Sequence, residues 1–456
     1  MREACCQRGE MNVASFRPRR NLETRDEWVA GERATSSGGV TARTFALDRA
    51  TQQRSAEGRW RALTVICAGV ILSMSPWFSA TAILPELKAH WHISEALAAW
   101  LTNAVQLGFV AGALLSGLTG LPDLVRPHRL MAVSALLVAA LNLALLYAPG
   151  GEIAVLIRFL TGVALSGVYP PAMKLVTTWF VHGRGMALGL IIGGLTLGSA
   201  FPHAIRAATT SVNWQLVVVA TSTMSLLAAV TFQVLTHEGP FSYPRAQFQP
   251  GQIRKVLRNR GIALANLGYF GHMWELYAMW GWFLAFSGSA LAAHGVEGKS
   301  AASLMTFGVI ACGVVGCVLG GWMADRIGRT ATTALMMGVS GSCALLIGWT
   351  YYGPLWLFIG VAVLWGISVI GDSAQFSAVI TEISDRSLVG TALAFQMGVG
   401  FALTVVSIQL TPIFAHWMGG WQWAFLLLVP GPLIGAAAML ILRRLPESVH
   451  IAHGRR

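Results

Sequence analysis

Apolar segments of roughly 20 residues recur from Trp60 to Leu442, and short polar joints separate them. A segment of this length can cross the hydrocarbon core of a bilayer as one α-helix. Twelve are predicted, at 61–84, 95–118, 129–148, 152–173, 185–205, 214–235, 262–287, 301–322, 331–350, 355–377, 389–410 and 421–442. Only 11% of the residues are charged, against roughly 25% in soluble domains. The sequence therefore predicts an all-α integral membrane protein and excludes a large water-soluble enzyme.

The net charge of +12 is distributed unevenly. When the joints are assigned alternately to two sides of a membrane, one side holds only Lys88, Arg206 and Lys299, and the other basic joint residues fall on the opposite side. The side rich in lysine and arginine is the cytoplasmic one. We therefore expect a multi-pass protein of the cell (inner) membrane with both termini in the cytoplasm. The basic character reflects membrane topology, and nucleic acid is not an expected partner.

The polar stretches divide the chain into parts. Residues 1–58 have mixed charge and no apolar periodicity, so we expect a disordered cytoplasmic extension. Residues 236–261 carry prolines, glycines and basic residues and are predicted to form a cytoplasmic linker. Six segments precede this linker (59–235) and six follow it (262–442), and residues 443–456 form a cytoplasmic tail.

Neither cysteine spacing nor any other motif predicts a prosthetic group. Two of the six cysteines lie in the polar N-terminal stretch and four in apolar segments, with no zinc-type spacing. No phosphate-binding loop or nucleophile–base arrangement is visible. We expect no cofactor, no metal and no enzymatic activity.

The two sets of six segments are related to each other. Gly162 and Gly167 in the fourth segment have the same spacing as Gly366 and Gly371 in the tenth. The joint GGWMADRIGRT at 320–330 has a degraded counterpart, GLTGLPDLVRPHR, after the second segment. Related halves of this kind are typical of transporters whose substrate site lies between two bundles.

These motifs resemble the major facilitator superfamily. GWMADRIGRT is similar to that family's loop signature G-x-x-x-D-R-x-G-R-R, RFLTG at 158–162 to its R-x-x-x-G pattern, and 169–189 to its passage from the fourth into the fifth span. The resemblance covers about 60–445. It implies twelve transmembrane helices in two pseudo-symmetric six-helix bundles, transport by alternating access, and a monomer in the lipid bilayer.

The loop signature implies a gate at the cytoplasmic ends of the helices. In the second half Asp325, Arg326 and Arg329 match the signature. In the first half Asp123 remains, and Arg126 supplies a nearby charge. Charge-assisted contacts of such residues with helix ends can stabilise one of two bundle arrangements. The alternative is that these are ordinary positive-inside residues.

Two ionisable residues lie near the middle of the seventh segment, in GYFGHMWELYAMWGW. His272 and Glu275 are three residues apart, so they share one helical face. An ionisable group in the bilayer centre costs several kcal/mol and therefore faces the protein interior. Glu275 is predicted to bind and release the coupling proton, and His272 to relay it or to contact an anion. The alternative is a hydrogen-bonded pair that holds helices together.

Two further ionisable residues lie in the fourth and tenth segments. Arg158 matches the superfamily's fourth-span arginine, which implies a charge that faces the cavity and assists proton transfer or anion binding. Alternatively, its side chain reaches out to the membrane surface. Asp372 follows Gly371 and corresponds to Val168 in the first half, so it is a candidate for coupling or for a cytoplasmic gate.

Polar and aromatic residues within the segments are candidates for the cavity wall. They are Asn103, Gln106, Tyr169, Trp274, Tyr277 and Gln396. Each of the three amides is equally well explained by a hydrogen bond to a neighbouring helix. Tyr169-Pro170-Pro171 is predicted to kink the fourth segment, because proline removes a backbone donor.

Together these features predict a secondary transporter of a small organic solute in symport with a proton, and the positive charge of Arg158 and His272 favours an anionic metabolite. Its partners are then a small-molecule substrate, the coupling proton and the bilayer. The alternatives are proton-antiport efflux of amphipathic compounds, transport of inorganic anions such as nitrate or nitrite, and a transporter-like solute sensor.

Overall fold

The computed structural model describes residues 58–180, 183–209, 213–241, 250–296, 298–385 and 388–455, without the side chains of Pro122, Asp123, Arg184 and His453. Every regular element in this part is a helix. Eleven helical segments there are long and apolar enough to cross a membrane. The predicted all-α membrane architecture is confirmed. Residues 1–57 of the predicted extension and residues 242–249 of the predicted linker fall outside the described residues.

The first half begins with a helical segment, Gly58–Ala82, that ends in η1 and α2. Its other elements follow in chain order: η1 (Ser75–Phe78), α2 (Ser79–Ala82), α3 (Leu84–Trp91), α4 (Glu95–Thr119), α5 (Leu121–Leu124), α6 (Pro127–Ala144), η2 (Leu145–Tyr147), α7 (Gly151–Leu165), α8 (Tyr169–Thr177), α9 (Arg184–Ala208) and α10 (Gln215–Leu235).

The second half contains η3 (Pro250–Gln252), α11 (Ile253–Arg258), α12 (Arg260–Ala293), α13 (Lys299–Ala311), α14 (Gly313–Ile327), α15 (Arg329–Leu346), η4 (Trp349–Tyr352), α16 (Leu355–Gly371), α17 (Ser373–Ile383), α18 (Val389–Trp417), η5 (Trp421–Leu428), α19 (Pro430–Arg444) and η6 (Pro446–Gly454). α15 occupies the predicted segment 331–350; it is less apolar than the other spans because Arg329 and several threonines fill its first turns.

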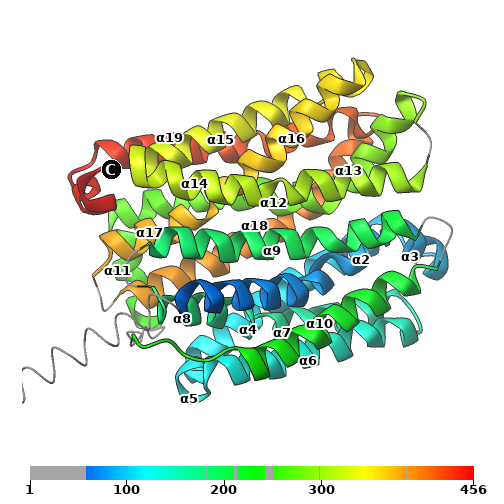
Figure 1. Cartoon of the computed structure of the whole chain (residues 1–456). Helices are drawn as coiled ribbons and strands as arrows, with labels where there is room; N and C mark the ends of the chain where they lie inside the picture. Colours follow the sequence, from blue (N-terminus) through cyan, green and yellow to red (C-terminus); the bar gives the residue numbers. More distant parts are fainter. Residues whose placement is uncertain are drawn as a thin grey trace, which may run out of the picture. The chain divides into compact units, whose positions relative to one another are not determined.

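Packing within and between the halves follows a simple pattern. In the first half α4 packs on α7 and α6 on α10; in the second half α12 packs on α18 and α19, and α15 on α19. The halves meet where α9 contacts α13 and α14 and where α4 contacts α18. α3 lies at one end of the helices, whereas α5, α11 and the C-terminus lie at the other (Figure 1). These are called the α3 end and the α11 end below.

Glycine contacts show the repeat in three dimensions. A Cβ atom on Gly162 would lie 2.1 Å from the carbonyl oxygen of Val105, and one on Gly366 would lie 2.0 Å from that of Val309. Such close approach is open only to glycine and lets helices pack tightly in lipid. A second pair of contacts, with the same spacing in the two halves, joins Gly112 to Val163 and Gly316 to Ile367. The predicted pseudo-symmetry of the halves is confirmed.

Breaks interrupt several spans. α7 ends at Leu165 and α8 starts at Tyr169, directly before Pro170, as the sequence predicted. The tenth span breaks at Asp372, which separates α16 from α17. Interrupted helices in a membrane protein expose backbone polar groups only where protein or a cavity surrounds them, so the breaks indicate the interior of a transport pathway.

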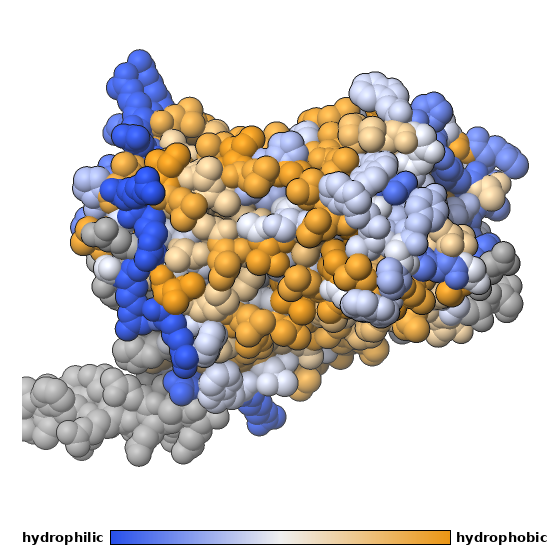
Figure 2. Space-filling model, turned by 90° about the horizontal axis from the view of Figure 1, so that it is seen from above, coloured by the Kyte–Doolittle hydropathy of each residue, from blue (hydrophilic) through white to orange (hydrophobic). Residues whose placement is uncertain are grey.

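The surface between the two ends is apolar. Figure 2 shows a broad orange band with blue patches concentrated towards the two ends. Large exposed apolar side chains also occur on helices around the molecule, among them Leu136 on α6, Leu227 on α10 and Leu433 on α19. A soluble monomer rarely exposes so large a contiguous apolar surface, so this band is the lipid-facing one.

Candidate functional site

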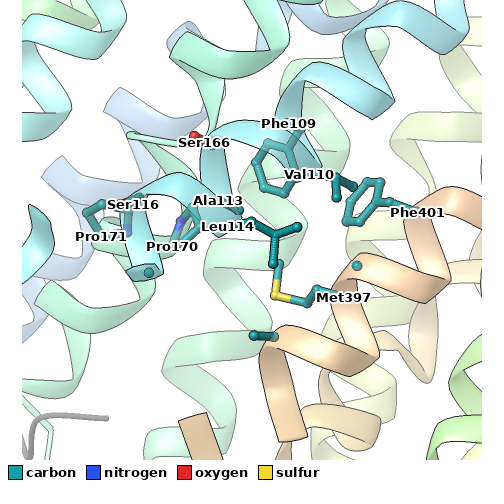
Figure 3. Close-up of a pocket in the computed structure, with 13 residues that line it drawn as sticks. Phe109, Val110, Ala113, Leu114, Ser116, Ser166, Pro170, Pro171, Met397 and Phe401 are labelled. Atoms are coloured by element: carbon teal, nitrogen blue, oxygen red, sulfur yellow. The ribbon is translucent and has the colours of Figure 1, made fainter. Parts of the chain in front are cut away.

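A cavity of about 200 Å³ lies between the halves. Its wall comes from α4, the α7–α8 break and α18 (Figure 3). The lining residues are Phe109, Val110, Ala113, Leu114, Ser116, Gly117, Ser166, Pro170, Pro171, Ala394, Met397, Gly398 and Phe401. Because only two hydroxyls interrupt an otherwise apolar wall, the cavity suits an apolar or aromatic group. It is smaller than the roughly 300–1,000 Å³ typical of drug-sized ligands, which favours a small solute.

Aromatic rings from both halves close the cavity on the side of the α3 end. The ring of Trp77 lies 5.0 Å from that of Phe109 and 6.2 Å from that of Phe401. The ring of Tyr277 on α12 lies 5.4 Å from that of Phe401 and 6.0 Å from that of Trp77. We call this cluster the aromatic plug: Trp77, Phe78, Phe109, Tyr277, Trp280 and Phe401. Tyr277, a predicted cavity residue, therefore belongs to the plug.

Asn103 and Gln106 lie on the same helix as the cavity wall. Both side chains are fully buried. Asn103, Gln106, Val110 and Leu114 follow one another at helical spacing, so they lie on one side of α4. Within the described part of the chain, none of the amide nitrogens or oxygens of Asn103 and Gln106 has a hydrogen-bond partner. Buried polar atoms without partners are rare and point to a ligand or water.

The other predicted wall residues are distributed differently. Tyr169 starts α8, directly before the cavity-lining Pro170. The Trp274 indole donates a 3.0 Å hydrogen bond to the carbonyl oxygen of Leu427 in the second half. Gln396 is buried and accepts a 3.4 Å hydrogen bond from Ser377 on α17. Their contacts support interhelical packing for Trp274 and Gln396.

The structure brings His272 and Asp372 together. His272 Nδ1 lies 2.9 Å from Asp372 Oδ1, and both side chains are almost completely buried. His272 Nε2 has no hydrogen-bond partner among the described residues. The rings of Tyr269 and Phe376 lie 6.1 and 5.5 Å from the imidazole. The pair therefore occupies a low-dielectric site at the break between α16 and α17, where a single proton would change the charge balance.

Glu275 has different neighbours from His272. Trp365 Nε1 on α16 donates to Glu275 Oε1 at 2.7 Å, and Ser340 Oγ on α15 donates to Glu275 Oε2 at 2.9 Å. The carboxyl group thus joins three helices of the second half and does not line the cavity. These contacts support the interhelical alternative, and its part in proton coupling stays a prediction.

Arg158 is fully buried, so it does not extend to the membrane surface. Its Nη1 donates to the carbonyl oxygen of Pro76 at 2.8 Å, its Nη2 to that of Trp77, and its Nε to that of Leu101 at 3.3 Å. Pro76 and Trp77 belong to the 3-10 helix η1, to which the first span narrows at this point, and Leu101 belongs to α4. Arg158 therefore supports the backbone beneath Trp77 of the aromatic plug.

Replacing Arg158 with methionine should destabilise the protein. The variant removes the hydrogen bonds from the guanidinium to the carbonyl oxygens of Pro76, Trp77 and Leu101, and a hydrogen bond to a charged group contributes about 1.5–3 kcal/mol. We expect a clear fall in the thermal unfolding midpoint of the purified protein in detergent and a smaller monodisperse fraction. Arg326→Met serves as the control, because Arg326 is exposed and stacks on Trp322 at 4.0 Å. Equal midpoints for Arg158→Met and wild type would contradict this role.

Equivalent spans of the two halves carry buried polar networks. The first, third and fourth spans contribute Ser79, Asn142 and Arg158, with Ser79 Oγ 2.6 Å from Asn142 Oδ1 and 3.3 Å from Arg158 Nη1. The seventh, ninth and tenth contribute Glu275, Ser340 and Trp365. Each of these two networks thus contains one buried ionisable side chain, Arg158 or Glu275, although on spans that are not equivalent.

The predicted gate residues lie at the α11 end. Arg329 Nε donates to both carboxylate oxygens of Glu382 on α17, at 3.0 and 2.9 Å, and Nη1 donates to Gln375 at 2.8 Å. The carboxylate of Asp325 is exposed. In the described part of the chain, the contacts of Arg329 and Arg326 stay in the second half. Arg126 is exposed, and the side chain of Asp123 lies outside the described residues.

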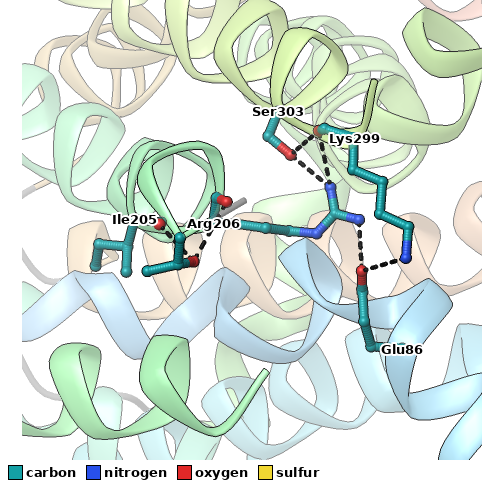
Figure 4. A network of polar contacts seen from close by, with 6 residues as sticks. Glu86, Ile205, Arg206, Lys299 and Ser303 are labelled. Carbon is teal, nitrogen blue, oxygen red and sulfur yellow. Dashed lines mark hydrogen bonds and ion pairs between the residues drawn. The ribbon is translucent and has the colours of Figure 1, made fainter. Parts of the chain in front are cut away.

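An ion-pair network that the sequence analysis missed joins the halves at the α3 end (Figure 4). Arg206 Nη2 on α9 donates to Glu86 Oε1 on α3 at 2.8 Å, and its Nη1 donates to Ser303 Oγ on α13. Lys299 Nζ lies 3.7 Å from the same Glu86 oxygen. We call Glu86, Arg206, Lys299 and Ser303 the α3-end latch. Two of its members are among the three basic residues assigned to the side poor in positive charge.

No metal site accompanies these features. Among the described residues, no group of three or more histidine, cysteine, aspartate or glutamate side chains is placed to hold a metal ion. The site therefore consists of an apolar cavity, an aromatic plug, buried polar groups and a latch, arranged between two pseudo-symmetric helical halves.

Such an arrangement is typical of membrane transporters. The family model described as "Major Facilitator Superfamily" matches residues 66–371. The chain belongs to the Major Facilitator Superfamily, as its motifs predicted. It is therefore a membrane transporter of small molecules and not an enzyme.

Among characterised proteins, the chain is 22% identical over 381 residues to the gentisate transporter of Corynebacterium glutamicum, with 80% of this chain and 84% of the relative covered. It is 23% identical over 418 residues to the 4-hydroxybenzoate transporter of Acinetobacter baylyi, with 79% and 84% covered. Among solved structures, an inward-facing bacterial homologue of the human lysosomal transporter Spinster superposes with a TM-score of 0.63 at 16% identity, covering 85% of this chain and 97% of the other. That similarity concerns the fold.

Proposed function

We propose that this chain transports a small organic anion, specifically a monocyclic aromatic acid, in symport with a proton. The single observation that carries the proposal is the small apolar cavity, bounded by the rings of Phe109 and Phe401, with the unpartnered amides of Asn103 and Gln106 further along the same side of α4. An aromatic ring packs well against such a wall, and amide N–H groups can donate to a carboxylate.

The relatives support this solute class. Gentisate and 4-hydroxybenzoate, after which the two relatives are named, are both hydroxylated benzoates. Each combines one aromatic ring with one carboxylate, which matches an apolar cavity next to buried donors. A general efflux pump would instead be expected to have a larger cavity, because its substrates are larger.

Proton coupling is assigned to the His272–Asp372 pair. A proton on Asp372 neutralises its carboxylate and weakens the contact with His272, so protonation and the geometry of the α16–α17 break are coupled. Glu275, which the sequence analysis predicted to carry the coupling proton, is the second candidate. The α3 end is assigned to the outside of the cell, and in this conformation the latch and the plug close that side.

The test uses purified protein in liposomes. Ring-labelled 4-hydroxybenzoate is supplied outside under an imposed pH gradient, acidic outside, and protein-free liposomes measure the passive leak. We expect uptake above the leak that collapses when an ionophore removes the gradient, and competition by unlabelled gentisate and benzoate. Competition by nitrate, sugars or amines instead of benzoates would refute the solute class, and gradient-independent uptake would refute symport.

A further inference from the structure

His203 lies on α9, and no polar contact with a described residue accounts for a histidine at this buried position. Its side chain is fully buried, and neither ring nitrogen has a hydrogen-bond partner among the described residues. A neutral imidazole has one donor and one acceptor to satisfy, and leaving them unpaired in a protein interior costs about 1–3 kcal/mol for each group. An unpaired buried histidine therefore points to a ligand.

The height of His203 along the helices follows from its neighbours. α9 runs parallel to the first span: a Cβ on Gly194 would lie 3.4 Å from the carbonyl oxygen of Cys67, and one on Gly198 would lie 2.5 Å from that of Ile71. One further turn along both helices brings His203 level with η1, which carries Trp77 and Phe78. His203 is thus level with the aromatic plug.

The direction of His203 follows from Arg206. These residues are three apart on α9 and lie on one side of that helix. Arg206 reaches Ser303 in the second half and Glu86 in the first, so this side of α9 faces the junction of the halves. The Nε–H of Arg206 is also buried without a partner among the described residues, so a second unpaired donor lies one turn from His203.

Other unpartnered donors lie at the same height. Thr102 on α4 contacts Thr81 through their hydroxyls at 2.8 Å, and Phe109 contacts Trp77, so Gln106 lies between these two levels. The Trp280 ring lies 5.9 Å from that of Phe78, and its indole N–H has no partner among the described residues. Gln106 on α4, His203 on α9 and Trp280 on α12 therefore supply buried N–H groups at one height along the helices, between the cavity and the latch.

We propose that His203, Gln106 and Trp280 form a carboxylate-binding subsite of the transported acid. The solute's ring occupies the cavity, and its carboxylate passes the edge of the aromatic plug to accept hydrogen bonds from these N–H groups. This assignment rests on the proposed function and adds which residues recognise the anionic group. Since N–H donors recognise a carboxylate far better than an uncharged carboxamide, the subsite gives the carrier its preference for acids.

The experiment measures binding to the purified full-length protein by isothermal titration calorimetry, with 4-hydroxybenzoate and its neutral analogue 4-hydroxybenzamide as probes. For His203→Leu we expect at least tenfold weaker binding of the acid, with binding of the amide changed less than twofold. Gln106→Leu should act in the same direction and guards against a folding defect of the first variant. His416→Leu, which alters an exposed histidine at the end of α18, should bind both probes like wild type.

The outcomes separate the subsite from the proposed function. Unchanged affinity for 4-hydroxybenzoate in both His203→Leu and Gln106→Leu would overturn the subsite and leave the aromatic-acid proposal standing. Equal weakening of acid and amide would also overturn it, because the variants would then act on packing and not on the anionic group. Failure of the wild-type protein to bind any aromatic acid would overturn both.

Discussion

Replacing Asp372 with asparagine should reduce uptake driven by a pH gradient about a hundredfold while leaving solute exchange close to the wild-type rate. Asparagine mimics a carboxyl that keeps its proton. A symporter in that state can still bind solute and cycle in the loaded form, so it exchanges labelled solute for unlabelled solute across the membrane. It cannot release a proton inside, so net accumulation stops.

This prediction is checked in liposomes by two assays on one preparation: accumulation of labelled 4-hydroxybenzoate under an imposed gradient, and exchange at equal pH on both sides. Asp385→Asn is the matched control, because Asp385 is an exposed aspartate at the α11 end and should behave like wild type. Comparison with Glu275→Gln decides whether Asp372 or Glu275 is the proton-coupling group. If Glu275→Gln separates the two activities and Asp372→Asn does not, the coupling group is Glu275.

The helices and the repeat could be predicted because their signals are local. Each span needs a long apolar run, and the close packing at Gly162 and Gly366 requires glycine at equivalent positions of both halves. The break at Tyr169-Pro170-Pro171 could also be predicted, because it follows from adjacent residues. Such features depend on composition and short-range stereochemistry.

The contacts of the ionisable residues could not be predicted because they join distant parts of the chain. His272 and Glu275 were expected to act on one face, yet His272 pairs with Asp372 and Glu275 with Trp365 and Ser340. A helical face spans enough arc to touch two different neighbours, and only the packing of α15, α16 and α17 decides which. The contacts of Arg158 could not be predicted either, because they depend on the narrowing of the first span to the 3-10 helix η1.

A signal for the α3-end latch was present in the charge pattern and its meaning was missed. Lys88, Arg206 and Lys299 were used only to assign sidedness, although all three lie within ion-pair distance of a glutamate in the structure. On the side of the membrane where basic residues are rare, we expect those that occur to have a specific ion-pair partner. Counting acidic residues in the same joints would have raised Glu86 and Glu95 as candidates.

Reversing one charge of the latch should open the α3 end. In Arg206→Glu a carboxylate faces Glu86, so a charge-assisted hydrogen bond, worth about 1.5–3 kcal/mol, is replaced by repulsion. Arg206 and Glu86 are mostly shielded, with 10% and 19% of their side-chain surface exposed, so screening by water weakens the pair only partly. We expect the population of open molecules to rise at least tenfold, and net uptake to fall because the carrier no longer closes this side efficiently.

The opening is measured as a distance between spin labels at the α3 end, one at Ala96 on α4 and one at Ala293 on α12, both exposed positions, in a chain with its six cysteines replaced. Arg206→Glu should shift the distance distribution to longer values, and the double variant Arg206→Glu with Glu86→Arg should return it towards wild type, because the pair is restored with opposite polarity. Lys88→Glu is the control: its partner Glu95 lies in the same half, so losing that ion pair leaves the two halves free to close as before. An unchanged distribution in Arg206→Glu, or a double variant that stays open, would show that the halves are held together at this end by the aromatic plug and helix packing alone.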